Sequence, residues 1–237
     1  LLDAALDSFA AAGISASSLR AIADQAGVTP ALVNYYFGNK QKLVEAVFEE
    51  LGVKQQVFSE IEPIISETAI LATNTSSLSV EDIGANLANP ERLVGFHFFN
   101  PVAVMPLIEV VKVPSTSDAT LATAMAVAKK LGKSAVITAD RPGFVVNRLL
   151  AKVMGEAARA LDEGTPLPVV ERALAPIGLP MGPFELLDVV GNDVSLAIEQ
   201  TLVATFGHEG WTPAPTLVRL VEEGKLGRKT KQGFHSY

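Results

Sequence analysis

The spacing of hydrophobic residues changes twice along the chain. Up to about residue 44, apolar positions recur every three or four residues. Short apolar runs follow up to about residue 140, and helical spacing then returns. We therefore predict an α/β plus all-α fold class: a three-helix head over residues 1–44, a segment with a sheet over 45–140 and a helical domain over 141–237. No Gly/Ser-rich or Pro-rich linker separates the first two segments.

The head has the start and stop signals of three short helices. The first ends at Gly13, the second spans residues 19–26 after a serine cap, and the third begins at Pro30. Thr29 is the expected N-cap of the third helix. A helix, a short turn and a second helix form the arrangement that enters the major groove of DNA.

The segment AGVTPALVNYYFGNK, which ends at Lys40, closely resembles the DNA-binding region of TetR-type repressors, and the resemblance covers residues 1–48. It implies that four residues face DNA, namely Thr29, Asn34, Tyr35 and Lys40.

Two features of the head favour other interpretations. Aromatic residues at helical spacing are usually core residues, so we expect Tyr36 and Phe37 to pack inside, while Tyr35 could do either. Three cations up to Val44 are balanced by three aspartates, so the head has no net positive charge for phosphate contacts.

Four apolar runs in the middle segment predict strands near residues 68–72, 92–97, 107–113 and 134–138, with an amphipathic helix over 121–131. This pattern is typical of half of a doubly wound sheet. The first run is followed by Asn74-Thr75-Ser76-Ser77, and polar groups at the carboxyl end of a strand are where such sheets bind ligands. Beyond Arg141-Pro142-Gly143 only helices are expected.

Five motifs in these two segments occur in an order that resembles 3-hydroxyacyl-CoA dehydrogenases. They are NTSS from Asn74, GFHFFNP from Gly95, PGFVVNR from Pro142, MGPF from Met181 with Asp188, and GRKT from Gly227 before Gly233-Phe234. The resemblance covers residues 45–237. It implies a Rossmann-like NAD-binding domain, a helical C-terminal domain that forms a homodimer, and NAD-linked oxidation of 3-hydroxyacyl-CoA to 3-oxoacyl-CoA in fatty acid β-oxidation.

Oxidation of a secondary alcohol requires a base for the hydroxyl proton, and histidine titrates nearest to neutral pH. His97 is the candidate base. Glu109 is a lone carboxylate in the apolar run Leu107–Val111, and it could orient the imidazole from a neighbouring strand. Without the family motifs, a satisfied core histidine and a solvated edge carboxylate would be the preferred interpretation.

The resemblance assigns further residues. Ser76 and Asn147 match polar groups that hold the reacting oxygen, although a helix cap and a surface amide are the alternatives for them. Glu49, Lys54 and Lys229 match residues near the cofactor, as does Ser76, and a solvated helix charge is the alternative for Lys54.

Residues 42–49 match both the fourth repressor helix and a dehydrogenase strand, and propensity alone does not choose between them. The 18 glycines include no Gly-x-Gly pair for a dinucleotide turn. We therefore interpret the chain as a chimera that lacks the N-terminal half of the NAD-binding domain, with NAD binding weakened. The alternatives are a TetR-like regulator with a dimerising or acyl-CoA-sensing body, and a fusion without function.

Composition narrows the remaining possibilities. The chain has no cysteine, and its three histidines lack metal-ligand spacing, so no metal site is expected. The net charge of -7 disfavours nucleic acid as a partner of the whole chain. No apolar run is long enough for a membrane span, which favours the cytoplasm. The first residue is leucine, which suggests a processed product or a fragment.

Overall fold

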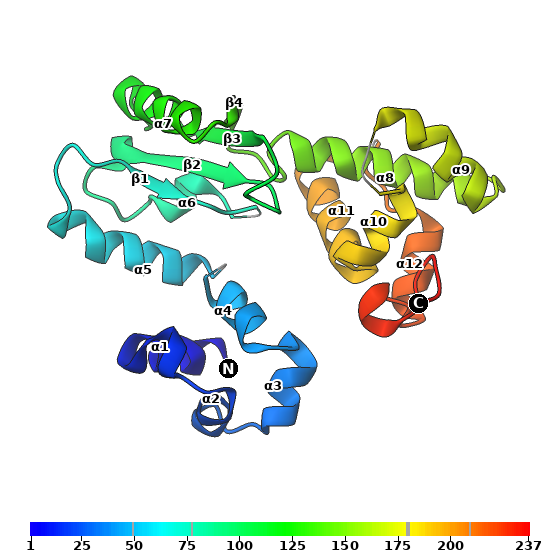
Figure 1. The fold of residues 1–237 in the computed structure, drawn as a ribbon, viewed down its shortest axis with the longest axis horizontal. Helices are drawn as coiled ribbons and strands as arrows, with labels where there is room; N and C mark the ends of the chain where they lie inside the picture. Colours follow the sequence, from blue (N-terminus) through cyan, green and yellow to red (C-terminus); the bar gives the residue numbers. More distant parts are fainter. Residues whose placement is uncertain (49, 77, 179–180, 209) are drawn as a thin grey trace. The chain divides into compact units, whose positions relative to one another are not determined.

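The computed structural model describes residues 1–48, 50–76, 78–178, 181–208 and 210–237. It divides the chain into two compact units, Leu1–Asp140 and Arg141–Tyr237, whose elements are labelled in Figure 1. Within the described residues, no helix combines the length and the apolar character that crossing a membrane requires.

The described residues up to Ile61 form helices joined by short turns. The helices are α1 (Leu2–Ala16), α2 (Leu19–Gln25), α3 (Pro30–Phe37), α4 (Lys40–Phe48) and α5 (Leu51–Ile61). The predicted caps are confirmed, because Ser18 Oγ accepts a hydrogen bond from the N–H of Ala21 and Thr29 Oγ1 accepts one from the N–H of Leu32. Gly13 interrupts α1 with a φ of 78° and does not end it, so that prediction was correct only in part.

Residues 40–48 form a helix, which corrects the strand alternative for residues 45–48. Asn39 Oδ1 accepts a hydrogen bond from the N–H of Lys42 at 3.0 Å in the first turn of α4. Leu43 and Val47, four residues apart, both enter the core shared by the first helices. This burial requires helical spacing. Glu49, a predicted cofactor residue, lies outside the described residues.

The sheet has the order β1-β2-β3-β4, with strands β1 (Leu71–Thr73), β2 (Leu93–Phe98), β3 (Leu107–Lys112) and β4 (Ser134–Ala139). β1 pairs with β2 and β3 with β4 in parallel, whereas β2 and β3 are antiparallel. The link over residues 99–106 explains this reversal, since it is shorter than the roughly dozen residues that a parallel crossover needs.

Helix α7 (Asp118–Lys130) covers one face of the sheet, as Figure 1 shows. Side chains alternate along a strand, so Val94 and Phe96 of β2 pack with Ala124 and Ala128 of α7 while His97 points to the opposite face. The short elements of this unit are η1 (Glu62–Ile64), α6 (Val80–Ile83) and η2 (Pro90–Arg92).

Gly95 allows α6 to approach the sheet beside His97. A Cβ atom at this position would lie 2.6 Å from Val111 Cβ and 2.9 Å from Val80 Cγ2. Any side chain there would push α6 away from β2, so this glycine of the GFHFFNP motif has a packing role.

The C-terminal unit is helical, as predicted. Its elements are α8 (Val146–Asp162), α9 (Leu167–Leu174), η3 (Ala175–Ile177), α10 (Pro183–Val190), α11 (Asn192–Phe206), α12 (Pro215–Glu222) and η4 (Arg228–Thr230). Buried Asp188 fixes the C-terminal segment, because its carboxylate accepts hydrogen bonds from the N–H groups of Phe234 at 2.9 Å and His235 at 2.8 Å. Asp188 of the MGPF motif therefore has a structural role.

Candidate active site

His97 and Glu109 form a buried pair across the antiparallel strands β2 and β3. They stand directly opposite each other in the ladder, and His97 Nδ1 lies 2.9 Å from Glu109 Oε2. Only 6% of His97 and 1% of Glu109 is exposed. A carboxylate accepts a hydrogen from Nδ1–H, so the lone pair of the neutral imidazole lies on Nε2. The predicted contact between these two residues is confirmed.

The loop after β1 reaches the same edge of the sheet. β1 and β2 are parallel, so both carboxyl ends lie at this edge, where His97 stands near the end of β2. Asn74 Oδ1 accepts a hydrogen bond from the N–H of Phe98 at 3.2 Å, and Lys54 Nζ of α5 donates to the carbonyl oxygen of Asn74 at 3.3 Å. Ser76 is exposed in this loop. Asn74 thus links the loop that contains Ser76 to the strand that contains His97, and Lys54 binds the same loop.

Asn74 was predicted only as part of a polar loop, yet its side chain ties that loop to β2. Its place directly after the first apolar run was the signal in the sequence.

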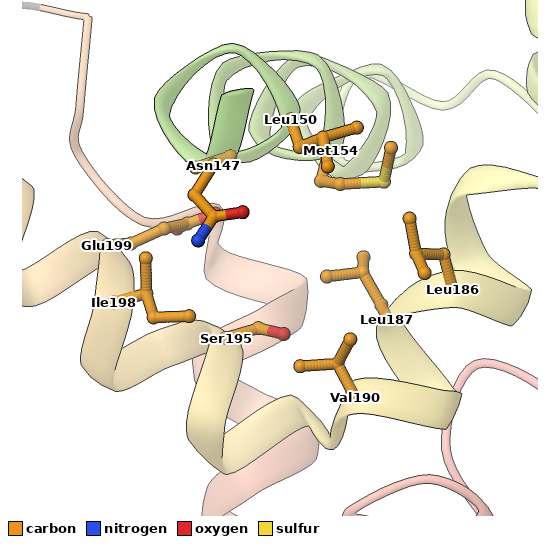
Figure 2. A pocket seen from close by; sticks show the side chains of 10 residues that line it. Asn147, Leu150, Met154, Leu186, Leu187, Val190, Ser195, Ile198 and Glu199 are labelled. Carbon is orange, nitrogen blue, oxygen red and sulfur yellow. The ribbon is translucent and has the colours of Figure 1, made fainter. Parts of the chain in front are cut away.

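The other two predicted site residues belong to the C-terminal unit. Asn147 lies in the first turn of α8 and lines a pocket between α8, α10 and α11. Figure 2 shows its amide pointing into this space. Lys229 Nζ forms an ion pair with the carboxylate of Asp193, 2.6 Å from Oδ2, so this predicted cofactor residue has a partner inside its own unit.

Glu199 in the same pocket was not anticipated from the sequence. It is 6% exposed, and burial raises the pKa of its carboxyl from 4.5 to about 7, although Arg159 lowers it. Among the described residues its Oε2 atom has no hydrogen-bond partner. The signal in the sequence was helical spacing. The buried face of α11 contains Ser195, Glu199 and Leu202, so two polar residues share a face with an apolar one.

The residues predicted to contact DNA differ in their surroundings. Tyr35 is 81% exposed and Tyr36 67% exposed, with their rings in an edge-to-face contact at 5.3 Å, so the prediction that Tyr36 packs inside was wrong. Phe37 does pack against the core of the helices. Asn34 is exposed, Thr29 caps α3, and Lys40 Nζ donates to the carbonyl oxygen of Ser15 at 3.2 Å. Val33 and Phe37, four residues apart, form the buried stripe of α3, so neither tyrosine lies on it.

Two family models together match nearly the whole chain. The model described as "3-hydroxyacyl-CoA dehydrogenase, NAD binding domain" matches residues 4–141, and the C-terminal domain model of the same enzymes matches residues 143–237. Because the first match begins at residue 4, it extends across the helical head. It gives no support to a missing N-terminal half, a TetR-type head or a chimera, and NAD is the cofactor of the matched domain.

Solved structures agree with this assignment. M. tuberculosis FadB2 is 38% identical over 80% of this chain and 68% of that chain, with a TM-score of 0.72. (S)-3-hydroxybutyryl-CoA dehydrogenase PaaH1 from Ralstonia eutropha is 31% identical over 92% and 86%, with a TM-score of 0.73.

The match to 3-hydroxybutyryl-CoA dehydrogenase from Escherichia coli is 37% identical over 79% of this chain but only 40% of that chain, with a TM-score of 0.74. Together with the two family models, these similarities show that the chain belongs to the 3-hydroxyacyl-CoA dehydrogenase family.

Proposed function

We propose that the chain interconverts 3-hydroxyacyl-CoA and 3-oxoacyl-CoA with NAD, and that His97 is the general base. The observation that supports this proposal is the buried His97–Glu109 pair at the edge of the sheet. Nε2 removes the proton of the 3-hydroxyl group while a hydride leaves C3, the carbon that bears this hydroxyl, and the C–O single bond becomes a carbonyl. The carboxylate of Glu109 stabilises the resulting imidazolium. In the reverse direction the imidazolium returns the proton.

The side chains at this edge fit the polar end of NAD. The ammonium of Lys54, the amide of Asn74 and the hydroxyl of Ser76 gather where α/β sheets bind nucleotides. NAD, when bound, supplies the hydride acceptor. Glu49 and Lys229 are the other cofactor candidates from the sequence. Since the chain has no Gly-x-Gly pair, no residue is assigned to the pyrophosphate.

Two further roles follow from the family motifs. By their match to these motifs, Ser76 and Asn147 are the candidates for hydrogen bonds to the reacting oxygen. The acyl-CoA substrate is the class named for the family.

A homodimer through the C-terminal unit is supported by its exposed apolar side chains, which include Leu149, Val169, Val189, Val190, Val194 and Ile198. Cytoplasmic activity in β-oxidation stays a prediction.

The test is NADH formation, followed by absorbance, with 3-hydroxybutyryl-CoA and NAD. The wild-type protein should turn over, and His97→Ala should lose activity by about 10²- to 10⁴-fold, because general base catalysis contributes that much. His235→Ala is the matched control, since this histidine is partly exposed and hydrogen-bonds Glu171. Equal rates for the wild type and His97→Ala, or no turnover by wild-type protein shown to be folded by circular dichroism, would refute the proposal.

DNA binding by residues 1–44 is a second candidate. The observation in its favour is the exposed pair Tyr35 and Tyr36 on α3, directly after α2 and its turn. A dimer would then present two heads to a palindromic site, and the body would sense acyl-CoA. Titration of a fluorescent DNA duplex at 50 and 200 mM salt tests this candidate. Salt-sensitive binding that Tyr35→Ala weakens would support it, and no binding at low salt would remove it.

A further inference from the structure

The loop over residues 99–106 connects the two strands that contain the proposed base and its carboxylate. It follows β2, where His97 lies, and it enters β3 shortly before Glu109. Phe99, the first residue of the loop, contacts the imidazole of His97. The two rings meet edge to face, with their centroids 4.8 Å apart and their planes at 63°. The conformation of this loop therefore decides what lies against the imidazole.

Lys133 binds this loop from the neighbouring strand. It directly precedes β4, which pairs with β3 in the register Leu107↔Ser134, so Lys133 stands where the loop ends. Its ammonium donates hydrogen bonds to the carbonyl oxygen of Met105, at 2.7 Å, and to that of Val102. Hydrogen bonds from a charged donor are stronger than those between neutral groups. One side chain thus holds two points of the loop.

The loop depends on such bonds because it buries little of its surface. The side chains of residues 100–106 are all exposed, and Val104 is 73% exposed. A segment with few buried apolar contacts opens locally at a low cost in free energy. The N–H groups of Val104 and Met105 both donate to the carbonyl oxygen of Pro101 at 2.9 Å, which closes a turn within the loop. Lys133 attaches this turn to the sheet.

We propose that Lys133 is a positioning residue for the proposed reaction: it holds the loop over residues 99–106 and thereby keeps Phe99 against the imidazole of His97. This inference rests on the proposed function. His97 is only 6% exposed, and the ring of Phe99 is part of its cover. Water that reached Nε2 would compete with the 3-hydroxyl group of the substrate for this nitrogen. Lys133 acts through Phe99 and does not itself touch the reacting atoms.

The first experiment measures kcat and KM for NADH formation with 3-hydroxybutyryl-CoA and NAD. Lys133→Met keeps an unbranched side chain and removes the ammonium, so kcat should fall by about 10- to 100-fold, since small displacements of a catalytic group have effects of this size. The KM for NAD should stay within about twofold, because the proposed cofactor site lies at Lys54 and the loop after β1. Lys133→Arg, which keeps a charged donor with several N–H groups, should recover most of kcat. Lys130→Met, the same chemical change at the exposed end of α7, should match the wild type.

The second experiment measures the cover of His97 without turnover. Diethyl pyrocarbonate acylates the unprotonated nitrogen of an accessible imidazole, and mass spectrometry of the peptides gives the initial rate at each histidine. His97 should react several times faster in Lys133→Met than in the wild type, because the loop opens more often. His235, whose side chain is 32% exposed, is the reference within each sample and should keep its rate. Lys133→Arg and Lys130→Met should leave both rates as in the wild type.

The two readouts separate this inference from the proposed function. An unchanged kcat in folded Lys133→Met would overturn the inference, and so would a lower kcat without faster labelling of His97. If the wild type does not turn over but labelling of His97 rises only in Lys133→Met, the role of Lys133 in holding the loop is supported and the dehydrogenase activity is rejected. No turnover together with unchanged labelling would reject both.

Discussion

Replacing Glu199 by glutamine should remove a loss of stability that the wild-type protein suffers as the pH rises from 5 to 8. Burial raises the pKa of Glu199 from 4.5 to about 7, although Arg159 lowers it. Between these values the unfolded chain releases a proton that the folded protein retains, so rising pH favours unfolding. The contribution is fully present below pH 4.5 and is lost by about pH 7. The loss is about 3 kcal/mol, at about 1.4 kcal/mol for each pKa unit.

The free energy of unfolding would be measured by urea titration at pH 5, 6, 7 and 8. Fluorescence of Trp211, the one tryptophan in the sequence, follows the C-terminal unit where Glu199 lies. The advantage of Glu199→Gln over the wild type in free energy of unfolding should grow by about 2 to 3 kcal/mol between pH 5 and pH 8. Ser195→Ala alters the same pocket wall without removing an ionisable group, so it should keep the wild-type pH dependence. Identical pH dependence in the wild type and Glu199→Gln would show that the carboxylate is hydrated in the folded protein, and the reasoning would fail.

Three further substitutions test other parts of the molecule. Glu109→Gln keeps a hydrogen bond to the imidazole but removes the charge, so kcat for NADH formation should fall by about 10²- to 10⁴-fold in a folded protein; an unchanged kcat would deny Glu109 its role. Gly233→Ala would place a Cβ atom in overlap with the Asp188 carboxylate, so thermal denaturation should show a destabilisation of about 2–4 kcal/mol. Gly52→Ala is the control, because a Cβ atom there meets no atom within 4 Å and should change stability by less than about 1 kcal/mol. The pKa of Glu62 lies below its usual 4.5, because the effect of burial, which raises it, is outweighed by hydrogen bonds from two backbone N–H groups and one side-chain amide. The stability that this carboxylate contributes above pH 4.5 is therefore lost as the pH falls, and urea titration of Glu62→Gln should show a weaker acid dependence than the wild type.

The strands and the contact between His97 and Glu109 could be predicted because their signals are local. Each apolar run became a strand within a few residues of its predicted bounds, since burial on a sheet requires consecutive apolar residues. Glu109 interrupts such a run, and a charge in a buried strand needs a partner, which His97 provides. The antiparallel direction of β3 was also present in the sequence, in the short link over residues 99–106.

The features that sequence analysis missed depend on which helical face meets a neighbour. Tyr36 and Phe37 are adjacent aromatic residues, yet Phe37 packs against the core while Tyr36 is exposed. Helix α11 offers a similar case, because Glu199 is buried in the folded unit, where its carboxylate lies beside Gly155 of α8. Helix propensity does not depend on which face of the helix a residue occupies. It therefore predicts neither the exposure of Tyr36 nor the burial of Glu199.

The His97–Glu109 pair and the proposed cofactor site depend on different parts of the N-terminal unit. Two neighbouring strands are enough to place His97 opposite Glu109, and α7 buries the other face of the same strands. The proposed cofactor site also needs α5, which contains Lys54, and the loop after β1. The placement of His97 opposite Glu109 therefore does not require a Gly-x-Gly turn. A chain without a Gly-x-Gly pair can therefore keep the His97–Glu109 arrangement, because that arrangement depends only on the pairing of β2 with β3.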